Sequence, residues 1–317
     1  MVTASWIDKR KPHWLRLEEM TGRTGIRTLK AFSPAELQEI SLLYRQVATD
    51  LSTLREDPLN QRTARYLNQL LARTHNLIYM GRRSSPAGIV TFYRSEFPRA
   101  FRRAFPYVVC AFAVFLCAAV AGALVCLGDP AFQRFFLGAA MTDTIERHQM
   151  WTHSVLAIKP LASSFIMTNN LSVSFAMFAS GITAGIGTVY MLLANGLLFG
   201  VITAACWQAG MLGQLMAFVA PHGVLELPAV FIAAGGGLLI ARALLFPGNL
   251  PRRDALVQHG ALAVRLALGI IPILVIAAII EAFLSPSAVS SGIKYLIAGI
   301  GATLLTVYLT KGGREAE

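Results

Sequence analysis

The stretch "PHGVLELPAVFIAAGGGLLIARALLF", residues 221–246, decides the fold class of this chain. Beyond Pro228 it is apolar, with Arg242 as its single charged residue. About 20 mostly apolar residues form a helix long enough to cross the ~30 Å hydrocarbon core of a bilayer. The stretch therefore predicts a membrane-spanning helix from about residue 223 to 246, with the ionisable pair His222 and Glu226 at its beginning.

The composition of the whole chain agrees with a membrane protein. Hydrophobic residues make up 55% of the 317 residues and charged residues only 14%, whereas soluble domains average ~25% charged. Residues 1–103 carry 18 of the 28 Lys and Arg but only 9 of the 17 Asp and Glu. Because no zinc-finger, helix-turn-helix or RNA-binding signature accompanies this basic charge, we expect a cytoplasmic membrane flank and no nucleic-acid partner.

Residues 1–103 are predicted to form a basic cytoplasmic helical domain. The segment "SPAELQEISLLYRQVATDLSTLRED", residues 33–57, begins with a capping box of Ser33 and Glu36 and continues with apolar residues every three or four positions. A second helix is predicted from about residue 60 to 80, which makes an antiparallel helical hairpin. The segment "HWLRLEEM" upstream favours a third, shorter helix.

Residues 104–311 are predicted to form an all-α bundle of six membrane spans, and residues 312–317 a short cytoplasmic tail. An external loop is expected at residues 129–168, after the first span. The spans are expected at about residues 106–127, twice within 169–206, and at 223–246, 261–284 and 293–309. The break within 169–206 is expected near Gly187–Thr188, with Asn195–Gly196 as the competing bend.

The basic flanks of these spans predict their orientation. With six spans and both termini inside, three basic groups fall on the cytoplasmic side, as the positive-inside rule requires. The loop at 129–168 and the "PHG" turn are then external. The groups are Arg99, Arg102 and Arg103; Arg252 and Arg253; and Lys311 and Arg314.

Four segments of the chain resemble the stage II sporulation protein M family. They are "LYRQVATDLSTLRED", "LNQLLARTHNLIY", "FIMTNNLSVSFAMFASGITAGIGTVYMLLANG" and "PHGVLELPAVFIAAGGGLLIARALLFPG". The resemblance implies an integral protein of the bacterial cytoplasmic (inner) membrane. The endospore member of the family is associated with a membrane complex that remodels peptidoglycan during engulfment.

Four polar residues at membrane depth form the candidate site. By the predicted topology, Asn169 and Asn170 lie at the same external level as His222 and Glu226. One asparagine suffices as an N-cap, and the other is free to reach Glu226. The cluster could be a structural clamp, an ion, proton or ligand site, or a catalytic pair. The H-E-x-x-H motif of metal hydrolases needs a second helical histidine, so we assign no catalytic residue, no metal ligand and no cofactor.

Small residues predict close helix packing in the membrane part. Gly181-x-x-x-Gly185 and Gly196-x-x-x-Gly200 allow two helices to approach closely. Asn195 with Gly196 favours a bend, with a polar contact on the cytoplasmic side as the alternative. We expect packing within one chain, with a homodimer face as the alternative. Glu281 and Lys294 flank the last external turn and predict a surface ion pair.

Three functions follow from these predictions. The first is a non-enzymatic scaffold in an envelope complex, which contacts lipids and binds proteins through the basic N-terminal domain and the external loop. The second is a transporter or channel-like protein centred on the polar cluster, because polar residues at membrane depth mark such sites. An intramembrane hydrolase comes third.

Overall fold

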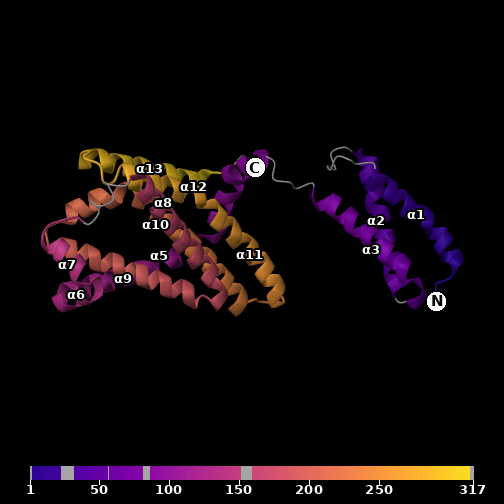
Figure 1. Ribbon diagram of the computed structural model, residues 1–317, viewed down its shortest axis with the longest axis horizontal. Helices are drawn as coiled ribbons and strands as arrows, with labels where there is room; N and C mark the ends of the chain where they lie inside the picture. Colours follow the sequence, from indigo (N-terminus) through magenta and orange to yellow (C-terminus); the bar gives the residue numbers. More distant parts are fainter. Residues whose placement is uncertain (1, 23–31, 56, 81–85, 151–158, 315–317) are drawn as a thin grey trace. The chain divides into compact units, whose positions relative to one another are not determined.

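The computed structural model describes residues 2–22, 32–55, 57–80, 86–150 and 159–314. Every regular element within these ranges is helical, which confirms the predicted all-α class (Figure 1). The chain divides into two compact units, Met1–Ile89 and Val90–Glu317. Residues 90–103, which the sequence assigned to the N-terminal domain, belong to the second unit. There the Arg102 guanidinium donates to the carbonyl oxygen of Gly312 at 2.8 Å.

The first unit consists of three helices around a hydrophobic core. They are α1 (Ala4–Gly22), α2 (Pro34–Arg55) and α3 (Gln61–Met80), with the short 3-10 helix η2 (Pro58–Asn60) between the last two. The capping box is confirmed, because the Ser33 amide donates to Glu36 at 2.8 Å and the Glu36 amide donates to the Ser33 hydroxyl at 3.3 Å. The predicted helical hairpin is α2 with α3, and α1 is longer than the short helix expected upstream. Core residues include Trp14, Leu17, Ile40, Val47, Leu54, Leu67 and Leu70.

Two carboxylates hold this first unit together. Asp50 is 1% exposed and accepts hydrogen bonds from the Trp14 indole at 2.8 Å and the Arg10 guanidinium at 3.1 Å. Asp57 accepts from the backbone amides of Val2 at 2.6 Å and Leu59 at 3.1 Å. These two hydrogen bonds, with that from Val2 having the larger effect, lower the pKa of Asp57, since a hydrogen bond to a carboxylate favours its charged form.

The second unit is a helix bundle. Five helices of the described chain are long and apolar enough to cross a membrane: Gly88–Gly128, Ile186–Gln208, Leu212–Leu245, Arg252–Phe283 and Ser291–Lys311. This confirms a membrane helix bundle. The elements of the second unit are α4 (Pro86–Thr91), the π-turn η3 (Phe92–Glu96), α5 (Phe97–Gly128), α6 (Pro130–Leu137), α7 (Ala139–Glu146), α8 (Lys159–Ala179), η5 (Ser180–Thr183), α9 (Ile186–Gln208), α10 (Leu212–Leu245), α11 (Arg252–Gly269), α12 (Ile271–Phe283) and α13 (Ser291–Lys311). Helix α8 is a further long helix beside the five candidate spans.

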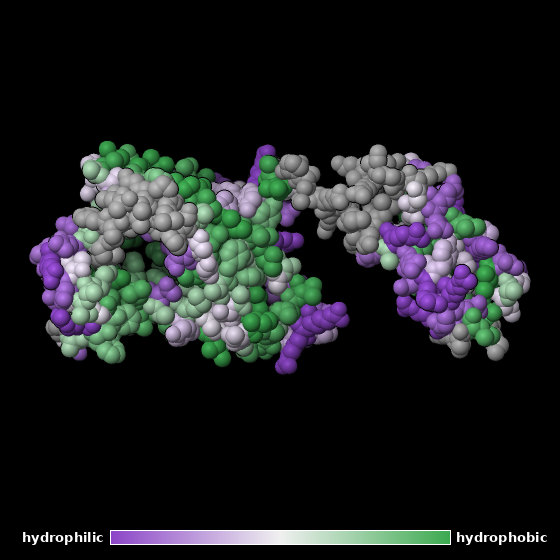
Figure 2. Space-filling view, viewed as in Figure 1, coloured by the Kyte–Doolittle hydropathy of each residue, from purple (hydrophilic) through white to green (hydrophobic). Residues whose placement is uncertain are grey.

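Helix α10 is the centre of the bundle. It packs against α5, α8, α9, α11, α12 and α13. Of the residues in its apolar 18-residue stretch, 67% are buried, compared with 22% for α13. The outer helices instead expose apolar faces. On α5, for example, Val109, Phe112, Leu116 and Val120 are all exposed and recur every three or four residues. Apolar surface covers much of this unit (Figure 2), as expected for a protein that contacts lipid.

Glycines bring the helix backbones close together. A side chain at Gly196 or Gly200 of α9 would collide with the backbone of Phe115 or Ala119 on α5. Gly181 lies in the same way against the backbone of Gly237 on α10. These glycines therefore serve packing within one chain.

The chain reverses between α8 and α9 earlier than expected. Ala184 and Gly185 both have positive φ, 54° and 85°, directly after η5, so the break near Gly187–Thr188 was predicted a few residues too late. The competing bend at Asn195–Gly196 is wrong, because α9 is continuous there. The Asn195 amide donates to the carbonyl of Met191 at 2.8 Å within the same helix.

Two predicted helix starts are also wrong. Helix α10 begins at Leu212 and passes through Pro221 and Pro228, so the "PHG" segment is helical and not an external turn. Helix α8 begins at Lys159 and not near Asn169. In both cases polar or helix-breaking residues suggested a loop, but a helix in an apolar bundle can contain them because neighbouring helices satisfy their polar groups.

Candidate functional site

A cavity of about 260 Å³ lies between four helices of the second unit. Three amide side chains and one carboxylate reach it: Asn169 and Asn170 from α8, Asn195 from α9 and Glu226 from α10. The space-filling view shows a hollow on this unit with hydrophilic atoms at its edge (Figure 2). The rest of the lining is apolar: Phe115, Val173, Leu198, Phe199, Ile202, Leu227 and Val230.

The asparagines lie where α8 crosses the bundle. Because α8 runs from Lys159 to Ala179, Asn169 and Asn170 are at its middle, and the expectation that they cap a helix is wrong. The Asn169 amide donates to the Asn170 carbonyl oxygen at 3.3 Å, and the Asn170 amide donates to Glu281 of α12 at 3.3 Å. The prediction that an asparagine contacts Glu226 is therefore wrong, since the carboxylate that Asn170 contacts is Glu281.

An imidazole and two carboxylates meet beside the cavity. His222 and Glu226 lie one turn apart on α10, on the same helix face, and Glu281 comes from α12. One potential ligand atom from each side chain lies within 4.8 Å of the others. Neighbouring groups orient two of the three, since Asn170 binds Glu281 and the Ser285 hydroxyl lies 2.9 Å from His222 Nδ1.

Lys294 supports this group from behind. It is 7% exposed and its ammonium donates to the carbonyl oxygens of Ser285 at 2.7 Å and Ser287 at 2.9 Å. The predicted surface ion pair of Lys294 with Glu281 is therefore wrong. The lysine fixes the turn after α12, and this turn holds Ser285 against the buried ring of His222.

The location of these charges is costly without a partner. Glu226 lies fourteen residues after Leu212, about 21 Å along the helix at 1.5 Å per residue. In the described part of the chain no hydrogen-bond donor reaches its carboxylate. Both carboxylates are partly buried. Two ionised carboxylates that close repel each other, and a cation or a proton between them would relieve the repulsion.

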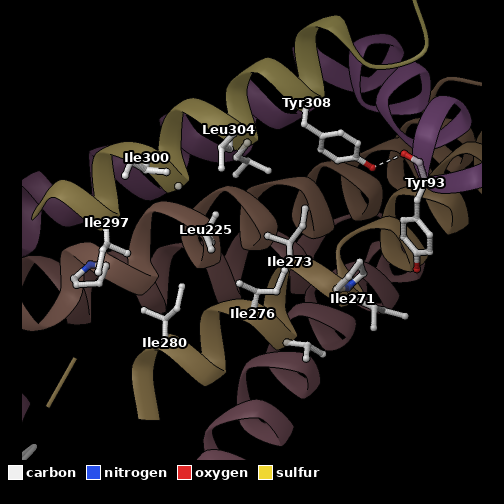
Figure 3. A pocket seen from close by; sticks show the side chains of 15 residues that line it. Tyr93, Leu225, Ile271, Ile273, Ile276, Ile280, Ile297, Ile300, Leu304 and Tyr308 are labelled. Carbon is white, nitrogen blue, oxygen red and sulfur yellow. Dashed lines mark hydrogen bonds between the residues drawn. The ribbon is translucent and has the colours of Figure 1, made fainter. Parts of the chain in front are cut away.

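A second, larger cavity has a different chemistry. It measures about 870 Å³ and is bounded by α10, α12 and α13. Isoleucine and leucine side chains such as Ile276, Ile300 and Leu304 line it, and the hydroxyl of Tyr308 donates to the Tyr93 carbonyl at one end (Figure 3). Such a lining offers little to a charged or strongly polar solute, so we take the smaller cavity as the candidate site.

Sequence reasoning found four of the site's residues and missed three. It selected Asn169, Asn170, His222 and Glu226, which the fold brings to one region. It assigned Asn195 to a bend, Glu281 to a surface pair and gave Ser285 no role. The available signal was Glu281 itself, because an acidic residue within a membrane helix usually faces the bundle interior.

Comparison with known proteins gives a family and no activity. A family model described as stage II sporulation protein M matches residues 99–286, and one described as a domain of unknown function (DUF8413) matches residues 4–80. An uncharacterized protein of Methanocaldococcus jannaschii is 32% identical over 123 residues, 38% of this chain and 69% of that protein. No solved structure matches. The chain thus belongs to the stage II sporulation protein M family.

Proposed function

We propose that the second unit is a transporter or channel-like membrane protein that takes up a cation or proton at the polar site. One observation carries this proposal. The cavity between α5, α8, α9 and α10 is lined by three asparagines and the carboxylate of Glu226, which has no hydrogen-bond donor among the described residues. A carboxylate left in this state at membrane depth is expensive, and such residues commonly mark ion or proton pathways.

The lining has the chemistry that a cation requires. The asparagine side chains offer carbonyl oxygens that can replace part of an ion's hydration shell, and Glu226 supplies the opposing charge. Helices α8 and α10 also lie next to each other, and between α8 and α9 the chain turns through η5 with backbone at positive φ. Polar side chains between packed helices at membrane depth are a feature of many transporters.

Flux through reconstituted vesicles tests this function. Vesicles that contain the purified chain and the pH-sensitive dye pyranine should respond to a potassium diffusion potential faster than protein-free vesicles. Glu226→Gln and Asn195→Leu should slow the response, because they remove the charge and one amide from the cavity. Gln208→Leu, an exposed change at the end of α9, is the matched control. Equal rates for wild type, both cavity variants and protein-free vesicles, with pyranine and with a trapped divalent-cation dye in its place, would refute the proposal.

A scaffold in an envelope complex is the second candidate. The observation that favours it is the first unit, whose three helices form a core of their own and whose residues 4–80 match a separate family model. A basic helical unit of this kind could bind a partner protein without any transport by the bundle. In-cell crosslinking at exposed positions of α2, compared with positions of α13, should then recover a partner at α2 only.

The proposed orientation has both termini in the cytoplasm. Its support is the distribution of basic residues, with Arg99, Arg102 and Lys311 at one end of the bundle, where Arg99 and Arg102 bond to the end of α13. The positive-inside rule assigns this end to the cytoplasm. A reporter fused after residue 314 should be active only if it functions in the cytoplasm, and activity of an externally active reporter would contradict the orientation.

A further inference from the structure

We infer that His222, Glu226 and Glu281 form a binding site for a divalent transition-metal ion within the membrane bundle. The inference rests on the proposed cation-transporting function and names the class of ion. Its basis is geometric: three side chains from two helices bring one ligand atom each to within 4.8 Å of the others. The ligand atoms of an ion bound at about 2.1 Å lie at most about 4.2 Å apart, so small side-chain rotations close the site.

Charge balance favours a divalent ion. Two ionised carboxylates and a neutral imidazole carry a charge of −2, which one divalent cation neutralises. This matters inside a bundle, where an uncompensated charge is strongly destabilising. A monovalent ion would leave one negative charge at the ligand atoms, which only the Lys294 ammonium behind Ser285 could offset among the described residues of this group.

The ligand types favour a transition metal. Ca²⁺ and Mg²⁺ prefer sites made of oxygen ligands alone. A histidine together with carboxylates suits Zn²⁺, Mn²⁺, Fe²⁺ or Co²⁺. His222 suits this role, because with a proton on Nδ1 it would donate to the Ser285 hydroxyl, 2.9 Å away, and would keep the lone pair of Nε2 for the ion.

The surroundings resemble the outer shell of a metal site. Asn170 donates to Glu281, Ser285 contacts His222, and Lys294 fixes the turn that carries Ser285. Groups of this kind orient metal ligands and tune their basicity. Access is also provided, because Glu226 belongs both to the ligand group and to the wall of the cavity with its three asparagines.

A Co²⁺ titration tests the inference. The full chain is purified in detergent through a tag without histidines, treated with a chelator and titrated with Co²⁺, whose visible absorption reports nitrogen and oxygen ligation. We expect saturation at one Co²⁺ per chain and displacement by Zn²⁺. Glu281→Gln should weaken binding by about 100-fold or more, and Asn170→Ala by about 10- to 100-fold, as for outer-shell changes in other metal proteins.

Glu146→Gln is the matched control, because it makes the same chemical change on α7 and away from the site; it should leave the affinity unchanged. The unfolding temperature without metal, measured for each variant, shows whether it is folded. Zn²⁺ should raise that temperature for wild type and for Glu146→Gln but not for Glu281→Gln. Absence of saturable Co²⁺ binding to the wild type, or equal binding by Glu281→Gln, overturns the inference and leaves a proton as the occupant.

This test and the flux experiment can fail independently. Metal binding that depends on Glu281, together with vesicles that show no flux, would support the metal site and reject transport. Flux that depends on Asn195, together with no Co²⁺ binding, would support transport and reject the metal site.

Discussion

Replacement of Gly200 by alanine should separate α9 from α5 and destabilise the bundle. An added Cβ would lie closest to the Ala119 carbonyl oxygen, 2.7 Å from the carbonyl carbon and 2.9 Å from Cα, whereas ordinary contacts begin at 3.4 Å. All three atoms are backbone, so no side chain can rotate away. Relief of the contact with the carbonyl carbon alone requires the helices to move apart by about 0.7 Å, and the nearer oxygen requires more; a gap of even this size forfeits a quarter to a half of each neighbouring dispersion contact.

The expected cost is about 1–3 kcal/mol, the usual range for an overpacked core. It can be measured by denaturant unfolding of the purified chain, followed by circular dichroism. Gly299→Ala is the control, because Gly299 lies within α13 with no atom near the added Cβ; helix propensity predicts a gain of up to about 1 kcal/mol there. If Gly200→Ala is as stable as wild type, the close approach of α5 and α9 is not as described.

Three predictions concern the first unit. Asp50→Ala leaves the buried Trp14 indole without an acceptor and should cost about 1–3 kcal/mol, measured as faster hydrogen exchange in α1–α3 of the full chain. Hydrogen bonds from backbone amides lower the pKa of Asp57 in the folded chain. Its contribution to stability is therefore complete above its pKa in the unfolded chain, about 3.9, and is lost as the pH falls through the lower pKa of the folded chain. Asp57→Asn should remove this loss, so the free energy of unfolding should change less with pH on the acid side. Burial and, second, the hydrogen bond to Glu18 raise the pKa of Tyr66 to about 12. Its contribution to stability is therefore complete below its pKa in the unfolded chain, about 10, and disappears as the pH rises through about 12. Absorbance at 295 nm follows the ionisation of the tyrosine, and unfolding measured at the same pH values follows the stability.

The sequence predicts most of the fold because its signals are local. The capping box at Ser33, the apolar repeat of α2 and the long apolar runs each depend on residues a few positions apart. Each of these signals led to a helix of the structure. The separation of a polar, basic first part from an apolar second part is equally local, since it depends on composition alone.

Helix starts in the bundle were predicted less well. The segment around Pro221 and Gly223 has residues that end helices in water, yet α10 continues through it. A helix in an apolar environment keeps its backbone groups paired, and neighbouring helices supply contacts that offset a local defect. Local propensity therefore predicted that α10 starts at the residues of the site. His222 and Glu226 were expected at a helix end but lie in the interior of α10.

The role of Glu281 was missed because it depends on the rotation of a helix about its own axis. Sequence distance suggested Lys294 as its partner, across a short turn. The rotation of α12 is instead set by Ala277, Ala278 and Ala282, which are fully buried. Glu281 lies four residues after Ala277 and three after Ala278, so it shares the face that packs against α8 and α10. Small residues three and four positions before an acidic residue in a membrane helix thus indicate a carboxylate directed into the bundle. This pattern adds a direction to the signal of the acidic residue itself, and together they could have predicted the third ligand of the proposed metal site.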